Sequence, residues 1–225
     1  EVFTSSFDSE DSDFVRFNRS EVRQAGSVTQ HGISIDLIEG RRHCRGRLRL
    51  SGERDVDLAR IRRLLGDLRE QRAYLPEDPH LLYATDVRSS EATTPNELPA
   101  PAAAVAAIQD SGRGRDLVGI YAAGGIHTGF ASSLGQRNWH SAYSYNFDWS
   151  FYHRKDKAVK STFGGFSWDQ EAFERKVGSA ARQLEVLEHP AHDARPGRYR
   201  VYLAPTALQE IIGMLSWGGF GLKSA

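Results

Sequence analysis

The residues of this chain that could do chemistry are mainly its histidines and the polar residues near them. His127, His140 and His153 fall in one stretch of the sequence, and Ser141 and Asp148 lie in the same stretch. A Ser/His/Asp hydrolase needs these residue types in hydrogen-bonding geometry. No Gly-x-Ser-x-Gly segment, which would present a serine on a strand-turn-helix, accompanies them. A hydrolase that uses such a site stays open as an alternative function.

Two further histidines could bind a metal ion. His189 and His192 stand three residues apart beside Pro190, but they follow the expected end of a helix, where the helix dipole favours positive side chains. We expect helix-terminal residues rather than a functional metal pair. The single cysteine, Cys44, excludes an internal disulfide and a Cys-x-x-Cys metal site, and it is typical of a reducing, cytoplasmic compartment.

One strand offers a polar face that could bind peptide. Between Asn138 and His153, aromatic residues alternate with small or polar ones, which predicts a long antiparallel strand with its aromatic face on the core. The main aromatic positions are Tyr143, Tyr145, Phe147, Trp149 and Phe151. The opposite face carries Asn146 and Asp148, which could line a peptide groove, although solvent is the commoner neighbour of such a face.

The segment from Tyr199 to Trp217 predicts a strand, a tight turn and a helix. Residues 198–203 alternate in character and favour a strand, and Pro205 should end it. Thr206 is then placed to cap a helix. The apolar positions at helical spacing are Leu208, Ile211, Ile212 and Leu215.

This strand and helix resemble a unit of the TldD/PmbA (TldD/TldE) family of peptidases. In that family a zinc-binding His-Glu-x-x-x-His segment follows a strand that ends in a Leu-x-Pro-like turn. Here the six residues 209–214 are Gln-Glu-Ile-Ile-Gly-Met. Glu210 matches the family glutamate, whereas Gln209 and Met214 stand at the two lost ligand positions. The run from Arg16 to Gln24 also resembles the Asn-Ser-x-x-x-Gln run of the family's opening strands.

The changed segment is unsuited to zinc. A hydrolytic zinc site usually has three protein ligands and an open position for water. The amide oxygen of Gln209 is a weak donor, and the thioether of Met214 suits softer metals. Without a metal-bound water, Glu210 has nothing to deprotonate, so it is expected to be vestigial.

The resemblance implies a metal-free, TldE/PmbA-like subunit of a cytoplasmic metallopeptidase that cleaves unstructured peptides. This chain would hold no cofactor and would not be catalytic alone. Zinc would belong to a TldD-like catalytic partner, and this subunit would shape the peptide chamber. A stand-alone peptide-binding module and self-association remain alternatives.

The sequence predicts an α+β fold of antiparallel sheets with packed helices. We expect a meander-plus-helix domain over residues 1–75, a linker with a short helix over 76–115, a second sheet-and-helix domain over 116–197, and the start of a C-terminal β-rich domain over 198–225. The resemblance implies the N-terminal half of a family member.

The expected elements follow from periodicity and turn residues. Residues 1–13 are acidic and Ser-rich and predict a loose, solvated segment. Turns are expected at 18–20, 31–32 and 40, and helices at 55–70, capped by Asp55, at 102–109, and from a cap at Asp169 to about residue 188. The expected strands are 14–17, 22–30, 32–39, 43–50, 117–123, 129–134, 138–153 and 158–163.

Composition argues against two classes of partner. Lys and Arg number 29 and so do Asp and Glu, so the overall charge favours neither nucleic acid nor an anionic membrane. The arginines of residues 41–69 alternate with apolar residues or with acids, and no stacking aromatics lie among them. No apolar run approaches the length of about 18 residues that a membrane helix needs.

Overall fold

The computed structural model describes residues 1–154, 157–190, 193 and 195–221. Within them lie seven strands and four helices, so the predicted α+β class is confirmed. The strands are β1 (Val2–Asn18), β2 (Glu21–Glu39), β3 (Arg42–Leu50), β4 (Ser90–Thr93), β5 (Asp116–Ser132), β6 (Arg137–Arg154) and β7 (Lys157–Gly165). The helices are α1 (Arg54–Arg72), α2 (Pro101–Ser111), α3 (Gln170–Val186) and α4 (Pro205–Leu215).

All seven strands belong to one sheet. Its order is β3-β2-β1-β5-β6-β4, and β7 also pairs with β6. Every pair is antiparallel except β4 with β6. The strands that were expected in two separate units therefore form one continuous sheet. They are joined because β1 of the first unit pairs along its length with β5 of the second.

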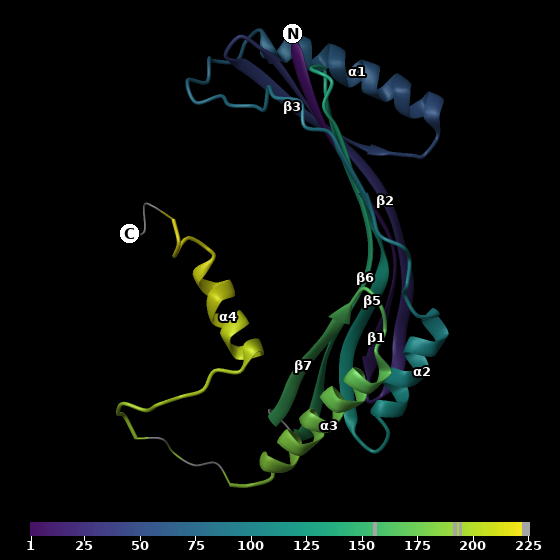
Figure 1. The fold of residues 1–225 in the computed structure, drawn as a ribbon, viewed down its shortest axis with the longest axis vertical. Helices are drawn as coiled ribbons and strands as arrows, with labels where there is room; N and C mark the ends of the chain where they lie inside the picture. Colours follow the sequence, from purple (N-terminus) through teal and green to yellow (C-terminus); the bar gives the residue numbers. More distant parts are fainter. Residues whose placement is uncertain (155–156, 191–192, 194, 222–225) are drawn as a thin grey trace.

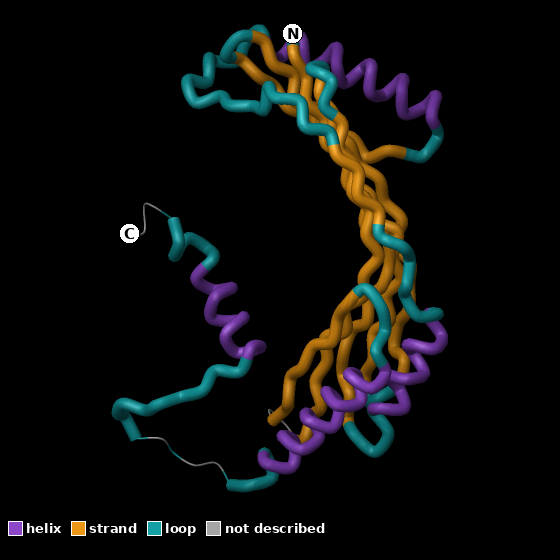
Figure 2. The backbone as a smooth tube through the Cα atoms, viewed as in Figure 1, coloured by secondary structure: helices purple, strands orange, loops and turns teal. Residues whose placement is uncertain are grey.

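The sheet is long and curved, so one of its faces is concave and the other is convex (Figure 1). Helix α1 lies at one end, helices α2 and α3 lie at the other, and α4 stands apart on the concave side (Figures 1 and 2). None of the helices among the described residues is long and apolar enough to span a membrane.

Two clusters of apolar side chains lie between the sheet and these helices. The larger one joins Phe17, Phe147 and Phe151 to Ile108 of α2 and Phe173 of α3. A smaller cluster packs Ile35, Leu37 and Cys44 against Leu68 of α1, so Cys44 is a packing residue. The predicted aromatic face of β6 is confirmed, because Tyr145, Phe147, Trp149 and Phe151 are all buried.

The prediction of a loose segment over residues 1–13 was wrong, because most of it belongs to β1, the strand between β2 and β5. Its polar side chains bond across to β2. Asp11 accepts a hydrogen bond from Thr29 at 2.9 Å, and Glu10 accepts one from Gln30 at 2.7 Å. Cross-strand polar pairs of this kind stabilise a sheet, so an acidic composition did not mean a solvated tail.

Two predicted strand breaks were also wrong. β2 runs through His31 and Gly32, and β5 runs through Gly124 and Gly125. A Cβ atom on Gly124 would lie 2.2 Å from the carbonyl oxygen of Asp11, so this glycine allows two strands to approach closely. The predicted turns at 18–20 and at Gly40 are confirmed by positive φ angles.

The helix starts confirm one predicted cap and correct two. Asp169 caps α3, because its carboxylate accepts the Ala172 N–H at 2.9 Å. Asp55 does not cap α1; Asp57 instead accepts the backbone N–H groups of Ser51 and Gly52, and the Ser51 bond is the main reason that its pKa is lowered. Thr206 lies inside α4, after Pro205 in the first turn, and no side chain caps this helix.

The helix predicted to follow a cap at Thr206 is confirmed as α4, Pro205–Leu215, but the strand expected before it was wrong. Residues 198–204 have no regular secondary structure. Their large side chains are exposed, as Tyr202 shows at 87%. Alternation favours a strand only where a neighbouring strand supplies hydrogen-bond partners, and none of the described strands lies beside this segment.

Candidate functional site

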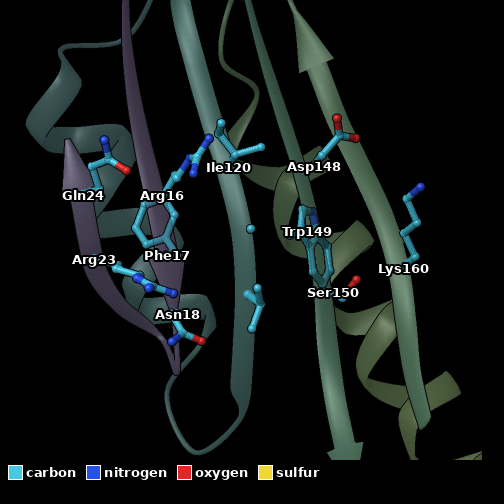
Figure 3. Close-up of a pocket in the computed structure, with 12 residues that line it drawn as sticks. Arg16, Phe17, Asn18, Arg23, Gln24, Ile120, Asp148, Trp149, Ser150 and Lys160 are labelled. Atoms are coloured by element: carbon cyan, nitrogen blue, oxygen red, sulfur yellow. The ribbon is translucent and has the colours of Figure 1, made fainter. Parts of the chain in front are cut away.

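A cleft of about 510 Å³ opens on the sheet where five strands meet (Figure 3). β2, β1, β5, β6 and β7 each contribute to it. Its lining residues are Arg16, Phe17, Asn18, Arg23, Gln24, Val118, Gly119, Ile120, Asp148, Trp149, Ser150 and Lys160.

Strand alternation decides which side chains give the cleft its chemistry. Arg16, Ile120 and Asp148 lie in one row, because Arg16 pairs with Ile120 and Ile120 pairs with Asp148. Their chain neighbours Phe17 and Trp149 point to the opposite, helix-covered face and are buried. The row therefore presents charged groups to the open face above an aromatic core.

A β-bulge places a second arginine in the cleft. Arg16 pairs with Gln24, whereas Phe17 pairs with Val22, so Arg23 has no partner in this ladder. A bulge of this kind turns two consecutive side chains toward similar directions. Arg23 and Gln24 both line the cleft as a result.

The hairpin turn beside the bulge is held by the chain before β5. Arg19 and Ser20 have φ angles of 52° and 63°, as a two-residue hairpin turn requires. Neither is glycine, so this backbone costs free energy that other contacts must offset. The Ser20 hydroxyl lies 2.7 Å from the carbonyl oxygen of Arg115, and the Ser20 N–H donates to the carbonyl oxygen of Leu117 at 2.9 Å. These bonds fix the β1–β2 hairpin against β5 at the end of the cleft.

The two residues predicted from sequence for peptide binding lie together here. Asp148 lines the cleft, and its carboxylate accepts a hydrogen bond from the Asn146 side chain at 2.9 Å. Asn146 is exposed and lies next to the lining residues rather than among them. Asn146 therefore orients Asp148, and Asp148 is the one that faces the cleft.

Helix α4 contributes one contact to the cleft. Lys160 of β7 donates a hydrogen bond to the Glu210 carboxylate at 2.9 Å, and both side chains are exposed. This bond raises the pKa of Lys160. Glu210, which was expected to be vestigial, thus forms an ion pair with Lys160 at the edge of the cleft.

These groups suit the binding of carboxylates better than proton transfer. Arginine stays protonated in proteins, and a lysine whose pKa is raised does not act as a base near neutral pH. Arg16, Arg23 and Lys160 carry three positive charges against the single carboxylate of Asp148. Within the described residues, neither Arg16 nor Arg23 forms an ion pair.

The three cations were missed in the sequence. Arg16 and Arg23 lie in a stretch that alternates like an ordinary solvated strand, and Lys160 lies more than 130 residues away. The Asn-Arg-Ser turn was the one signal nearby, and it predicts a hairpin rather than a bulge.

The residues at the lost ligand positions do not fit zinc. Gln209 and Met214 are exposed on α4. An amide oxygen and a thioether are a poor donor set for this metal. No cluster of three or more His, Cys, Asp or Glu residues suited to a metal is found in the part of the chain that the structure describes. His192 lies outside the described residues. The expectation that His189 and His192 are helix-terminal residues rather than a metal-binding pair therefore stays a prediction.

Among the described residues, His127 and Ser141 do not form a Ser/His/Asp site with Asp148. The His127 ring lies 2.7 Å from the Ser141 hydroxyl, and the two residues pair across β5 and β6. Asp148 is seven positions further along β6, about 23 Å away at the rise of a strand and on the opposite face. A second His–Ser pair, His31 with Ser9 at 2.8 Å, lies on the same face as His127. The sequence had given no sign of this second pair, because its members come from different strands.

Solved structures of other proteins share the fold of this chain. TldE from Thermococcus kodakarensis superposes with a TM-score of 0.56 at 12% sequence identity, over 82% of this chain and 44% of that one. This chain has the TldE fold. A candidate modulator of a DNA gyrase from Thermotoga maritima gives a TM-score of 0.58 at 9% identity, over 80% of this chain and 44% of the other. A candidate modulator of DNA gyrase from Bacteroides thetaiotaomicron gives a TM-score of 0.60 at 10% identity, over 82% of this chain and 45% of the other.

The similarity is one of fold. Neither a family model nor a curated protein sequence matches the chain. The chain spans less than half the length of the solved structures that it matches. The resemblance to the TldD/PmbA family seen in the sequence is thus confirmed as a shared architecture.

Proposed function

We propose that this chain belongs to a TldE/PmbA-like, non-catalytic subunit of a heteromeric, cytoplasmic zinc metallopeptidase that cleaves unstructured peptides. The observation that carries the proposal is the TldE fold of a chain whose motif segment on α4 holds Gln209 and Met214 in place of metal ligands. Zinc and the hydrolytic water would belong to a TldD-like partner. This chain would help to shape the surface that holds the peptide.

The cleft supports that role. An open sheet face lined by charged side chains can hold an extended peptide by its polar groups while leaving the chemistry to another subunit. The cations of the cleft are suited to binding, and none of them is poised as a base. We also propose that residues 76–115 form a linker between an N-terminal unit, residues 1–75, and a second unit, residues 116–197.

The first test measures zinc per chain by elemental analysis. The protein is purified alone, without an affinity tag, and dialysed against a weak chelator. We expect less than about 0.1 equivalent, because neither an amide nor a thioether holds zinc at neutral pH. The double variant Gln209→His/Met214→His is the matched control, since a gain of zinc only there would support the assignment of lost ligands. About one equivalent in the unaltered chain would overturn it.

The second test asks for the partner. A TldD-like protein with an intact His-Glu-x-x-x-His motif, encoded in the same genome, is mixed with this chain and passed over a sizing column. We expect co-elution, and hydrolysis of an unstructured peptide that is lost when the partner's motif glutamate is changed to glutamine. A failure to associate would overturn the subunit role.

A stand-alone peptide-binding module is the second candidate. It is favoured by the cleft itself, which is formed wholly by strands of this chain. Peptide binding by a monomer that associates with no TldD-like protein would support this alternative, and self-association would be seen on the same column.

A further inference from the structure

We propose that the cleft binds the carboxylate groups of acidic peptides, and that Glu210 occupies the Lys160 end of it in the free chain. The proposal rests on the proposed function in taking a peptide as the ligand. Its starting point is that a carboxylate already sits on one of the cations, because Lys160 donates to Glu210 at 2.9 Å. Glu210 thus shows which chemical group this end of the cleft accepts.

The two ends of the cleft are spaced for an extended peptide. Arg16 lies on β1 and Lys160 on β7, with β5 and β6 between them (Figure 3). Three strand spacings amount to about 14 Å, and an extended chain covers this distance in roughly four residues. Two acidic side chains about four positions apart would therefore reach both ends.

The charges of the cleft favour acids at its ends and polar groups at its centre. Arg16 and Arg23 lie together at the β1–β2 end, where guanidinium groups can bind a carboxylate through two hydrogen bonds. Asp148 lies between the ends and can accept backbone N–H groups of the peptide, while it disfavours a third acid. With Glu210 displaced, the cleft has a net charge of plus two from three cations and one carboxylate.

The displacement of Glu210 is inexpensive. The ion pair is exposed, and exposed pairs contribute little to stability. The side chains of α4 are partly or fully exposed, and Met214, for example, is 71% exposed. A peptide carboxylate can therefore replace Glu210 without breaking a packed core.

The experiment measures fluorescence anisotropy of dye-labelled, unstructured peptides on the 225-residue chain. One peptide carries glutamate at two positions four residues apart, and its matched partner carries glutamine at both. At low ionic strength we expect the glutamate peptide to bind about tenfold more tightly, as two charge-assisted contacts allow. Added salt should reduce the difference.

Single charge-to-amide variants locate the site. Arg16→Gln, Arg23→Gln and Lys160→Gln should each weaken binding of the glutamate peptide by roughly three- to tenfold and leave the glutamine peptide unchanged. All three positions are exposed, so the fold should tolerate them, and circular dichroism checks this. The matched control is Arg63→Gln on α1, at the other end of the sheet, which should change nothing.

Glu210→Gln tests the internal competitor. We expect it to tighten binding of the glutamate peptide about threefold, and to have no effect in a Lys160→Gln background. Equal effects in both backgrounds would show that Glu210 does not compete at Lys160, and would overturn that part of the proposal.

The outcomes separate this inference from the proposed function. Equal binding of both peptides, or equal binding of a short polyphosphate and the glutamate peptide, would overturn the acidic-peptide site and leave the subunit role standing. Glutamate-specific binding without any association with a TldD-like protein would support the site and overturn the subunit role.

Discussion

The two faces of the sheet are built by the same strands but have opposite character. Phe147 and Asp148 are consecutive residues of β6, yet Phe147 is fully buried under α3 and Asp148 lines the open cleft. The helix-covered face obtains its stability from aromatic packing. The open face carries charges that contribute little to stability and are free to bind a ligand. The two-residue period of a strand thus separates the residues that stabilise the fold from those that face a ligand.

The sharpest test of this contrast compares Phe147→Ala with Asp148→Ala. Phe147 packs against Phe17 and Phe173, so its loss should lower the free energy of unfolding by about 3–5 kcal/mol. Asp148→Ala should change it by less than about 0.5 kcal/mol. Urea unfolding followed by tryptophan fluorescence measures both. Similar costs for the two variants would contradict the division of roles.

A smaller effect is expected at Gly124, where β5 lies close against the backbone of β1. In Gly124→Ala, the added methyl would meet the backbone of Asp11 and Ser12 at 2.2 and 2.4 Å. Backbone cannot move aside cheaply, so we expect a loss of about 1–3 kcal/mol in unfolding free energy. Gly66→Ala is the matched control, because Gly66 lies within α1 with nothing within 4 Å of the added methyl. It should stabilise the chain by up to about 1 kcal/mol. Stabilisation by both changes would show that the sheet is not tight at Gly124.

The smallest effect concerns a buried hydroxyl on the covered face. Burial raises the pKa of Tyr121 to about 12, and its hydroxyl has no hydrogen-bond partner among the described residues. Tyr121→Phe should be neutral or stabilising by up to about 1 kcal/mol at pH 8. Between the ordinary tyrosine pKa of about 10 and the folded value, the unfolded chain loses this proton and the folded chain keeps it. Stability should therefore fall as pH rises through this window, and less steeply in the variant.

Urea unfolding at pH 8 and pH 11 makes the measurement. Tyr145→Phe is the control, because the Tyr145 hydroxyl donates to the carbonyl oxygen of Ser167 at 3.4 Å. That variant should lose a few tenths of a kcal/mol at pH 8 rather than gain stability. An unchanged pH slope in Tyr121→Phe would mean that this hydroxyl ionises in the folded chain as it does in the unfolded one.

The sequence predicted those features that depend on local pattern. The alternation of β6, the cap at Asp169 and the helix that carries Leu208 to Leu215 all follow from neighbouring residues, and each is present. Strand length was underestimated in β2 and β5, because Gly32 and Gly124 are typical of turns when the neighbouring strand is unknown. Residues 198–203 show the converse, since their alternating pattern has no neighbouring strand to pair with.

The cleft could be predicted only in part. Asp148 was found because it lies on the polar face of a recognisable strand. Arg23 was not, because its bulge exists only relative to the register of β1. The contact of Lys160 with Glu210 joins residues 50 positions apart and depends on where α4 lies. Long-range register and helix placement are properties of the whole sheet, and no local window of sequence contains them.

The position of β1 in the sheet has a consequence for how the chain folds during synthesis. β1 can pair with β2 as soon as the hairpin is made, but β5 begins at Asp116, 98 residues after β1 ends at Asn18. Such distant pairing is slow, and until it forms, one edge of β1 has no partner and could pair with another chain. Asp8, Glu10, Asp11 and Asp13 lie along this strand. Since charged residues on an open edge discourage aggregation, we expect these acids to protect the nascent chain until β5 is made.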